Sequence, residues 1–171
     1  ASGLSKIGSL QFDSAGDLFV TGGDAGDGGE GQGFIDEFVN SGGTLSSTPN
    51  SIATGLYNPG GMAFDSAGNL YVGIENSLQT GDGQVYEYAN NGGILSSTGT
   101  EYISSLSHPL GVLFDNSDNL YVANFTTGII NEGAGTFVSG LSYPTFMTFN
   151  SLGDMYVSLY LNGDIDEITP D

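Results

Sequence analysis

The sequence has no cysteine and almost no basic residues. Without cysteine it can form no disulfide bond, thiolate metal site or cysteine nucleophile. Lys6 is the only Lys or Arg against 20 acidic residues, and the formal net charge at pH 7 is −19. Nucleic acids and anionic lipids both require clustered Lys or Arg, so these two partner classes are excluded. No apolar run approaches the roughly 18 residues of a membrane helix, so we expect no insertion into a membrane.

The remaining composition is typical of one folded domain with a polar surface. The chain has 171 residues, of which 38% are hydrophobic and only 12% are charged, unlike a disordered acidic tail. Its 29 glycines have no collagen period and are expected to mark turns. The sequence starts with Ala and has no basic n-region, so we expect any targeting peptide to have been removed. The base-poor surface predicts a secreted or cell-surface protein.

Four segments of the sequence align with one another without gaps, at residues 8–20, 60–72, 110–122 and 145–157. Each has an alternating apolar strand, a turn rich in Asp, Asn and Gly, and a second strand ending in aromatic-Val. A third strand with the pattern Gly-x-Ile/Val-x-Glu follows in every unit, and a fourth strand follows in the first three. Four short antiparallel strands repeated every 35–50 residues or so predict an all-β propeller. We assign one domain, 1–171, with blades at roughly 4–56, 57–106, 107–141 and 142–171.

The second unit carries a family resemblance. Its residues 59–72, Pro-Gly-Gly-Met-Ala-Phe-Asp-Ser-Ala-Gly-Asn-Leu-Tyr-Val, resemble the NHL repeat. Similar repeats build the propellers of gluconolactonases and streptogramin lyases, and also many non-catalytic extracellular domains. The resemblance therefore implies a β-propeller and leaves the activity open. The chain departs from the family in having acids where basic residues are common near the third strand, and in having only four units.

The two ends of the sequence do not complete a ring neatly. Residues 2–5 match residues 139–142, the end of a fourth strand, and the last unit stops after its third strand at residues 163–168. Three outcomes are open: a compact four-bladed ring with a weak seam, a fragment of a longer propeller, or a subunit completed by its neighbour. Because an open strand edge is a template for another chain, we expect self-association through these edges, into a homo-oligomer or filament.

A first candidate site is a position that recurs just before the first strand of each unit. It holds Lys6, Asn58, His108 and Tyr143, and Pro follows in the last three units. Such loops surround one mouth of a propeller channel, where ligands commonly bind. These four residues are therefore the predicted ligand-binding residues. The alternative is an exposed loop position that tolerates any residue.

A second candidate site is the loop at residues 24–30, Asp-Ala-Gly-Asp-Gly-Gly-Glu, which only the first unit has. The carboxylates of Asp24, Asp27 and Glu30 are of the kind that surrounds Ca²⁺, which takes six to eight oxygen ligands. We expect no cofactor, with calcium at this loop as the one alternative. The spacing differs from that of an EF-hand, and the alternative is a solvated glycine-rich hairpin tip.

Two further series recur in every unit and are interpreted as structural. They are Glu37, Glu87, Glu132 and Glu167 in the third strands, and Asp13, Asp65, Asp115 and Asn150 in the turns. Catalysis needs one distinguished residue and not four copies of it. Asp and Asn at the start of a turn bond to the backbone that follows, which is a structural role.

Catalysis finds little support in the sequence. His108 is the only histidine, arginine is absent, and no Gly-x-Ser-x-Gly, phosphate-loop or His-Glu-x-x-His motif occurs. We therefore predict a non-enzymatic NHL-like propeller, secreted, that acts as a structural, self-assembling or binding module without catalytic residues. The alternative is a ligand-binding or catalytic fragment of a metal-dependent, lactonase- or lyase-like propeller that uses the channel mouth.

Overall fold

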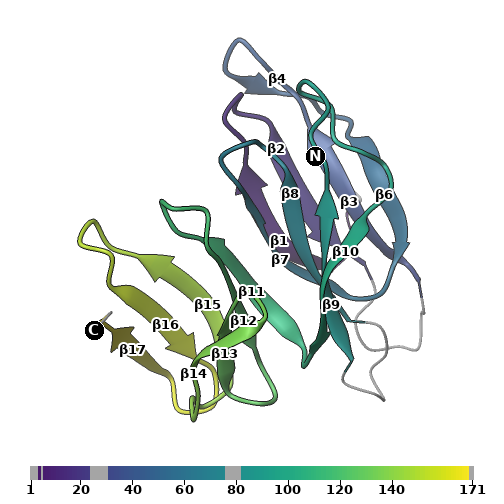
Figure 1. Ribbon diagram of the computed structural model, residues 1–171. Coiled ribbons are helices and arrows are strands. Elements are labelled where there is room, and N and C mark those ends of the chain that lie inside the picture. The colour runs from purple at the N-terminus through teal and green to yellow at the C-terminus, as the bar shows by residue number, and fades with distance from the viewer. Residues whose placement is uncertain (1–3, 5, 24–30, 76–81, 170–171) are drawn as a thin grey trace.

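A computed structural model describes residues 4, 6–23, 31–75 and 82–169. Within these residues the chain consists of strands and turns, without a helix. Four antiparallel sheets follow one another as the blades of an incomplete propeller (Figure 1). The predicted all-β propeller built from four NHL-like units is thus confirmed as a fold. A helix long and apolar enough to cross a membrane does not occur in the described part of the chain.

Each blade is formed by consecutive strands of the chain. Blade 1 contains β1 (Ile7–Phe12), β2 (Leu18–Gly22), β3 (Gly33–Phe38) and β6 (Asn50–Leu56), and a small hairpin of β4 (Asn40–Ser41) and β5 (Thr44–Leu45) extends from it. Blade 2 contains β7 (Pro59–Phe64), β8 (Leu70–Glu75), β9 (Gly83–Tyr88) and β10 (Thr100–Leu106). Blade 3 contains β11 (Pro109–Phe114), β12 (Leu120–Asn124), β13 (Ile129–Glu132) and β14 (Gly135–Val138). Blade 4 contains β15 (Pro144–Phe149), β16 (Met155–Leu159) and β17 (Asp164–Ile168).

The turn between the first and second strands of each blade is held by its Asp or Asn. In blade 2 the Asp65 carboxylate accepts hydrogen bonds from the backbone N–H groups of Ala67 and Asn69, at 3.0 and 2.8 Å. The corresponding side chains of the other blades accept the same pair of bonds. Gly68 has the positive φ of +81° that the turn requires, and Asp118 has a φ of +60° at the equivalent position in blade 3. The structural interpretation of the Asp and Asn series is confirmed.

The recurring glutamates lie opposite aromatic residues of the second strands. Glu87 pairs in register with Tyr71, Glu132 with Tyr121, and Glu167 with Tyr156. The Tyr156 hydroxyl donates a 2.6 Å hydrogen bond to Glu167. Burial, together with the negative charge and hydrogen bonding of Glu132, raises the pKa of Tyr121 to about 12. Glu132 and Glu167 thus accept hydrogen bonds from phenols of the second strands, and Glu37 accepts one from Asn50 of β6, which are structural roles.

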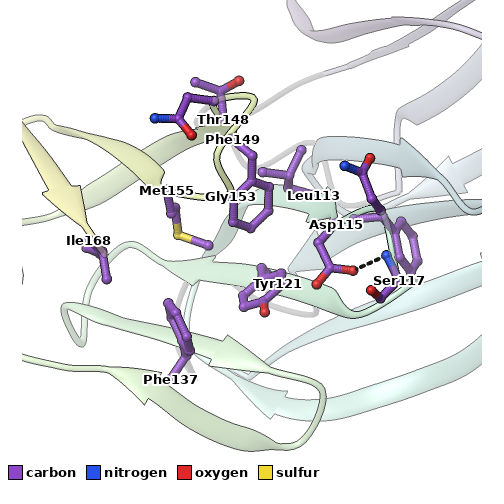
Figure 2. A pocket seen from close by; sticks show the side chains of 13 residues that line it. Leu113, Asp115, Ser117, Tyr121, Phe137, Thr148, Phe149, Gly153, Met155 and Ile168 are labelled. Carbon is purple, nitrogen blue, oxygen red and sulfur yellow. Dashed lines mark hydrogen bonds between the residues drawn. The ribbon is translucent and has the colours of Figure 1, made fainter. Parts of the chain in front are cut away.

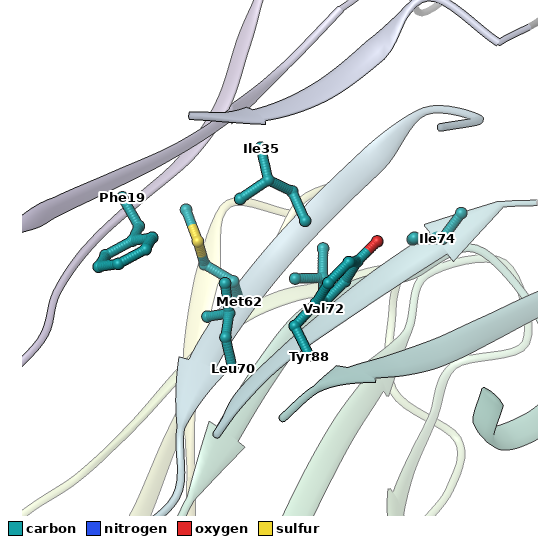
Figure 3. Close-up of a cluster of buried hydrophobic side chains, with 7 residues drawn as sticks. All are labelled: Phe19, Ile35, Met62, Leu70, Val72, Ile74 and Tyr88. Carbon is teal, nitrogen blue, oxygen red and sulfur yellow. The ribbon is translucent and has the colours of Figure 1, made fainter. Parts of the chain in front are cut away.

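The hydrophobic core is divided among three junctions, each formed by two consecutive blades. Figure 3 shows the junction of blades 1 and 2, where side chains from both sheets interdigitate. Its buried members are Phe19, Ile35, Met62, Leu70, Val72, Ile74 and Tyr88. Equivalent clusters join blades 2 and 3, and blades 3 and 4. The blades are therefore held together by burial of apolar faces rather than by shared strands.

The arc of four blades is open. Blade 4 lies at one end of the arc and blade 1 at the other (Figure 1). In the described part of the chain, β1 pairs only with β2, and β17 pairs only with β16. Blade 4 has three strands, as its sequence predicts. The compact closed ring, one of the three outcomes left open by the sequence, is not the arrangement observed.

Candidate functional site

The four residues predicted to bind a ligand share one backbone conformation. Lys6, Asn58, His108 and Tyr143 have φ angles of 44°, 40°, 53° and 55°, in the left-handed region that non-glycine residues seldom occupy. The carbonyls of Lys6, His108 and Tyr143 accept backbone hydrogen bonds of 3.0–3.2 Å from the end of the second strand in their own blade. The position thus has a structural task, which is to turn the chain into the first strand of each blade.

The first strands of all four blades line one cavity of about 390 Å³. β1, β7, β11 and β15 contribute its walls, which places them around a common channel that is open on the side where the arc is open. The four predicted residues lie directly before these strands. Their side chains are not among those that line the cavity, so they lie beside the channel rather than inside it. Their binding of a ligand stays a prediction.

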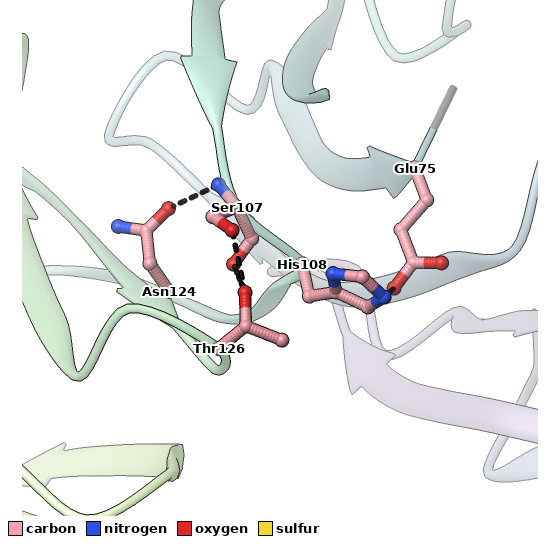
Figure 4. A network of polar contacts seen from close by, with 5 residues as sticks. All are labelled: Glu75, Ser107, His108, Asn124 and Thr126. Carbon is pink, nitrogen blue, oxygen red and sulfur yellow. Dashed lines mark hydrogen bonds and ion pairs between the residues drawn. The ribbon is translucent and has the colours of Figure 1, made fainter. Parts of the chain in front are cut away.

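His108 is brought against a buried carboxylate from the preceding blade (Figure 4). Glu75, the last residue of β8, is only 4% exposed, and its Oε1 lies 3.5 Å from His108 Nε2. Its other oxygen, Oε2, and His108 Nδ1 are buried and have no hydrogen-bond partner within the described structure. Buried polar atoms without a partner are rare, and a carboxylate and an imidazole in contact that each have one mark a candidate for a catalytic role.

The segment before His108 is fixed by a polar cluster that includes buried Asn124 (Figure 4). The Asn124 side-chain oxygen accepts a 2.9 Å hydrogen bond from the Ser107 N–H, and its amide group donates a 2.6 Å bond to the side-chain oxygen of Asn131. The hydroxyls of Ser107 and Thr126 lie 2.5 Å apart. Because the equivalent of Asn124 is Ile74 in blade 2 and Leu159 in blade 4, this cluster occurs once and positions His108 alone.

The equivalent contact at the next junction is aromatic. The ring of Tyr143 lies 4.9 Å from the ring of Phe125, which occupies in blade 3 the position of Glu75 in blade 2. The same position holds Gly23 in blade 1 and Tyr160 in blade 4.

Sequence reasoning missed Glu75 because it follows the aligned second strand, beyond the part that repeats. A comparison of the residues at this position in the four units would have identified Glu75, because it is the only acid among them.

The largest cavity described, about 470 Å³, lies between blades 3 and 4 (Figure 2). Tyr121, Phe149 and Met155 form apolar walls, and the Asp115 carboxylate at its rim accepts a hydrogen bond from Ser117. A similar gap of about 340 Å³ occurs between the turns of blades 1 and 2. Because the polar group belongs to a structural turn and the gap recurs, this cavity is a feature of blade packing.

The described residues do not provide a metal site. No group of three or more His, Asp or Glu side chains gathers among them, so Glu75 and His108 lack a third partner of this kind. Two such donors fall short of the six to eight oxygens that Ca²⁺ takes and of the three protein ligands of a catalytic zinc. The predicted calcium ligands Asp24, Asp27 and Glu30 lie outside the described residues.

Comparison with known proteins finds similarity in structure alone. No protein-family model and no curated protein sequence matches the chain. Its structure is similar to that of virginiamycin B lyase from Staphylococcus aureus (TM-score 0.66, 14% identity, 100% of this chain and 58% of that one). It is also similar to a gluconolactonase from Xanthomonas campestris (TM-score 0.67, 15% identity, 90% and 54%). A third similar structure is named as an oxidoreductase (glucose dehydrogenase) from Thermus thermophilus (TM-score 0.69, 15% identity, 99% and 63%).

These similarities confirm the propeller fold and the resemblance to lactonase- and lyase-type propellers. The chain spans between about half and two thirds of the length of these proteins. The prediction that the protein is not an enzyme is contradicted, because the similar structures carry the names of a lyase, a lactonase and a dehydrogenase. That prediction rested on the lack of catalytic sequence motifs. In a propeller, residues of different blades can meet without any contiguous sequence motif, as the contact between Glu75 and His108 illustrates.

Proposed function

We propose that the protein hydrolyses a small cyclic ester and that it works outside the cell. The reaction would take place at the end of the channel, where blades 2 and 3 meet. The observation that carries the proposal is the contact between buried Glu75 and His108, each with one polar atom unpartnered in the described structure. The gluconolactonase-like fold supports the reaction class. The base-poor surface, with a net charge of −19, supports the extracellular location.

The two side chains supply what ester hydrolysis requires. A water oxygen must bond to the carbonyl carbon, the ring C–O bond must break, and a proton must pass from the water to the departing ring oxygen. Glu75 would accept the proton from the water, and His108 would return one to the ring oxygen. Their 3.5 Å separation is of the kind that shortens when a ligand binds. The channel of about 390 Å³ is lined in part by β11, the strand that follows His108, and it lies in the size range of small-molecule sites.

Glucono-1,5-lactone is the probe for this proposal. We expect the protein to accelerate its hydrolysis above the spontaneous rate, measured by acid release in a pH-stat. Glu75→Gln should lower kcat/KM about 100-fold or more, because a positioned acid or base contributes this much. His108→Asn should also lower it. The equivalent residue in blade 2 is Asn58, which has the same left-handed conformation, so the His108→Asn variant should keep its backbone conformation.

Glu101→Gln is the matched control, because it removes the same charge from an exposed position on the outer strand β10. Its kcat/KM should equal that of the unmodified protein. Thermal unfolding of all three variants checks that the fold is kept. The proposal is wrong if the lactone is hydrolysed no faster than in buffer, or if Glu75→Gln and Glu101→Gln have the same activity.

A further inference from the structure

Each junction between blades repeats one aromatic contact. A ring from the second strand of one blade meets, edge to face, a ring at the end of the first strand of the next blade. The three pairs are Phe19–Phe64, Tyr71–Phe114 and Tyr121–Phe149, with centroids 5.1, 4.9 and 5.3 Å apart and planes at 73°, 70° and 71°. By sequence position the next members are Tyr156 at one end of the arc and Phe12 at the other. The two ends therefore hold the two halves of a fourth pair.

The third strands show that blade 4 has a face prepared for a following blade. Ile35, Val85 and Ile130 are each 0% exposed, because every one of them is covered at a junction. Their equivalent in blade 4, Ile165, is 72% exposed. An isoleucine at the centre of an uncovered sheet face, at a position buried in every other blade, indicates an unfilled contact.

In blade 1 the uncovered face is the one directed away from blade 2. Leu10 is 60% exposed and Phe12 is 56% exposed, whereas Met62, the equivalent of Leu10 in blade 2, is 4% exposed. Leu10 also borders an apolar hollow of about 380 Å³ on this face, together with Leu18 and Phe38. This face has the residues with which blades 2, 3 and 4 each receive the blade before them.

Backbone packing at the junctions also indicates that the faces of blade 4 and blade 1 are complementary. A Cβ added to Gly33 would lie 2.4 Å from the Pro59 ring, and one added to Gly83 would lie 2.3 Å from the Pro109 ring, so each glycine admits the proline of the next blade. In blade 3 the equivalent Gly128 instead meets the Leu141 carbonyl of its own blade, and in blade 4 the equivalent Gly163 has no atom within 4 Å of that position. At the other end, Ile7 occupies the position of these prolines and is exposed.

We infer that these two terminal faces bind each other between copies of the chain, head to tail. Blade 4 of one copy packs on blade 1 of the next, with Tyr156 edge to face on Phe12 and Ile165 against Leu10. The interface continues the series of three junctions already present in the arc, and the second copy also covers the open side of the channel. Because two different surfaces meet, the assembly is heterologous and either closes into a ring or grows as a filament.

Charge decides the conditions in which this association is observed. Every copy has a net charge of −19, so copies repel one another at low ionic strength. Salt screens this repulsion, with a Debye length of about 3 Å at 1 M, but leaves the burial of apolar faces in place. We therefore expect the dissociation constant to fall as salt is added, contrary to an interface held by ion pairs.

Analytical ultracentrifugation in about 0.5 M NaCl, a salt level that screens most of the repulsion, tests the inference. The chain should sediment as species of twice 17.6 kDa or larger multiples. Ile165→Asp and Leu10→Asp should each weaken association roughly 30-fold or more, as expected for a residue at the centre of an interface. Ile94→Asp is the matched control, because Ile94 is equally exposed but lies outside both faces, and it should leave association unchanged.

Mixing the two variants distinguishes head-to-tail pairing from pairing of like faces. Ile165→Asp retains the face of blade 1, and Leu10→Asp retains the face of blade 4. Each variant alone should be monomeric, while their equimolar mixture should form one intact junction and hence a dimer that does not grow further. The inference is overturned if Ile165→Asp still dimerises alone, if the mixture stays monomeric, or if the unmodified chain is a monomer at every concentration and salt level.

Discussion

Replacing Gly111 with alanine is expected to lower the free energy of unfolding by about 3 kcal/mol, the upper part of the range for overpacking a core. A Cβ at this position of β11 would lie 2.3 Å from the carbonyl oxygen of Thr145 and 3.1 Å from the Cβ of Ala123. The first neighbour is backbone of the adjacent first strand, β15, so no side-chain rotation relieves the clash. The two strands must separate, and the junction of blades 3 and 4 loses packing.

Gly135→Ala is the control for this prediction. Gly135 lies in the same blade, its φ is not in the left-handed region, and its nearest neighbour would be an ordinary 3.5 Å from the new Cβ. Thermal unfolding followed by far-UV circular dichroism measures both variants. Gly111→Ala should lower the melting temperature by roughly 6–12 °C, at 2–4 °C per kcal/mol for a chain of this size. Equal midpoints for the two variants would show that the first strands are not packed as closely as described.

Acidification from pH 7 to about pH 4.5, near the ordinary carboxyl pKa values, is expected to stabilise the protein at low salt. The chain has 20 carboxylates and one lysine, so folding concentrates negative charge with little compensation. Protonation relieves this repulsion more in the folded state than in the extended chain. We expect the melting temperature to rise by roughly 4–8 °C, which corresponds to about 2 kcal/mol.

Two aspartates indicate the pH range over which the stability changes and the direction of the change. Burial raises the pKa of Asp36 above its ordinary value of 3.8, although a hydrogen bond from Ser51 opposes it. Its folded form binds a proton more readily than the unfolded form, so stability increases as the pH falls through the raised pKa. Burial would also raise the pKa of Asp115, but hydrogen bonds from Asn119 and Ser117 outweigh it and lower the pKa. The stabilisation from Asp115 is present above pH 3.8 and is lost below it, so stability passes through a maximum in mild acid.

Differential scanning calorimetry across this range, with and without 1 M NaCl, measures the effect. Salt should shrink the difference between the two pH values, because it screens the repulsion that protonation relieves. Asp36→Asn should raise the melting temperature more at pH 7 than at the acidic pH. A melting temperature that is lower at about pH 4.5 than at pH 7, in low salt, would show that the turn hydrogen bonds outweigh the collective repulsion.

The fold was predictable from the sequence because its signals are local and repeated four times. The alternation in residues 62–64, the Asp65 turn and the Leu-Tyr-Val strand that follows it are each weak alone, but their recurrence sets strand order and blade number. The position of Asn58 and His108 before the first strands was predictable for the same reason. What repeats in a propeller is its architecture, and so repetition identifies the scaffold.

The candidate site was only half predictable, because it depends on residues that break the repeat. His108 was singled out as the only histidine, but its partner Glu75 replaces residues as different as Gly23 and Phe125. Nothing local distinguishes Glu75 as buried, since its burial depends on the neighbouring blade. The open arc was likewise beyond the sequence, because closure depends on the angle between blades.

Packing only between consecutive blades has a consequence for how the chain folds. The three core clusters each join neighbours in the sequence, and the main contacts between strands of different blades run between the same neighbours. Stability is then approximately a sum of blade and junction contributions along a line. The middle blades, held on both sides, form the most persistent part, and the outer blades open first. The chain can begin to fold at any blade and add the others in turn. A destabilising substitution in one terminal blade therefore does not lower the stability of the other terminal blade.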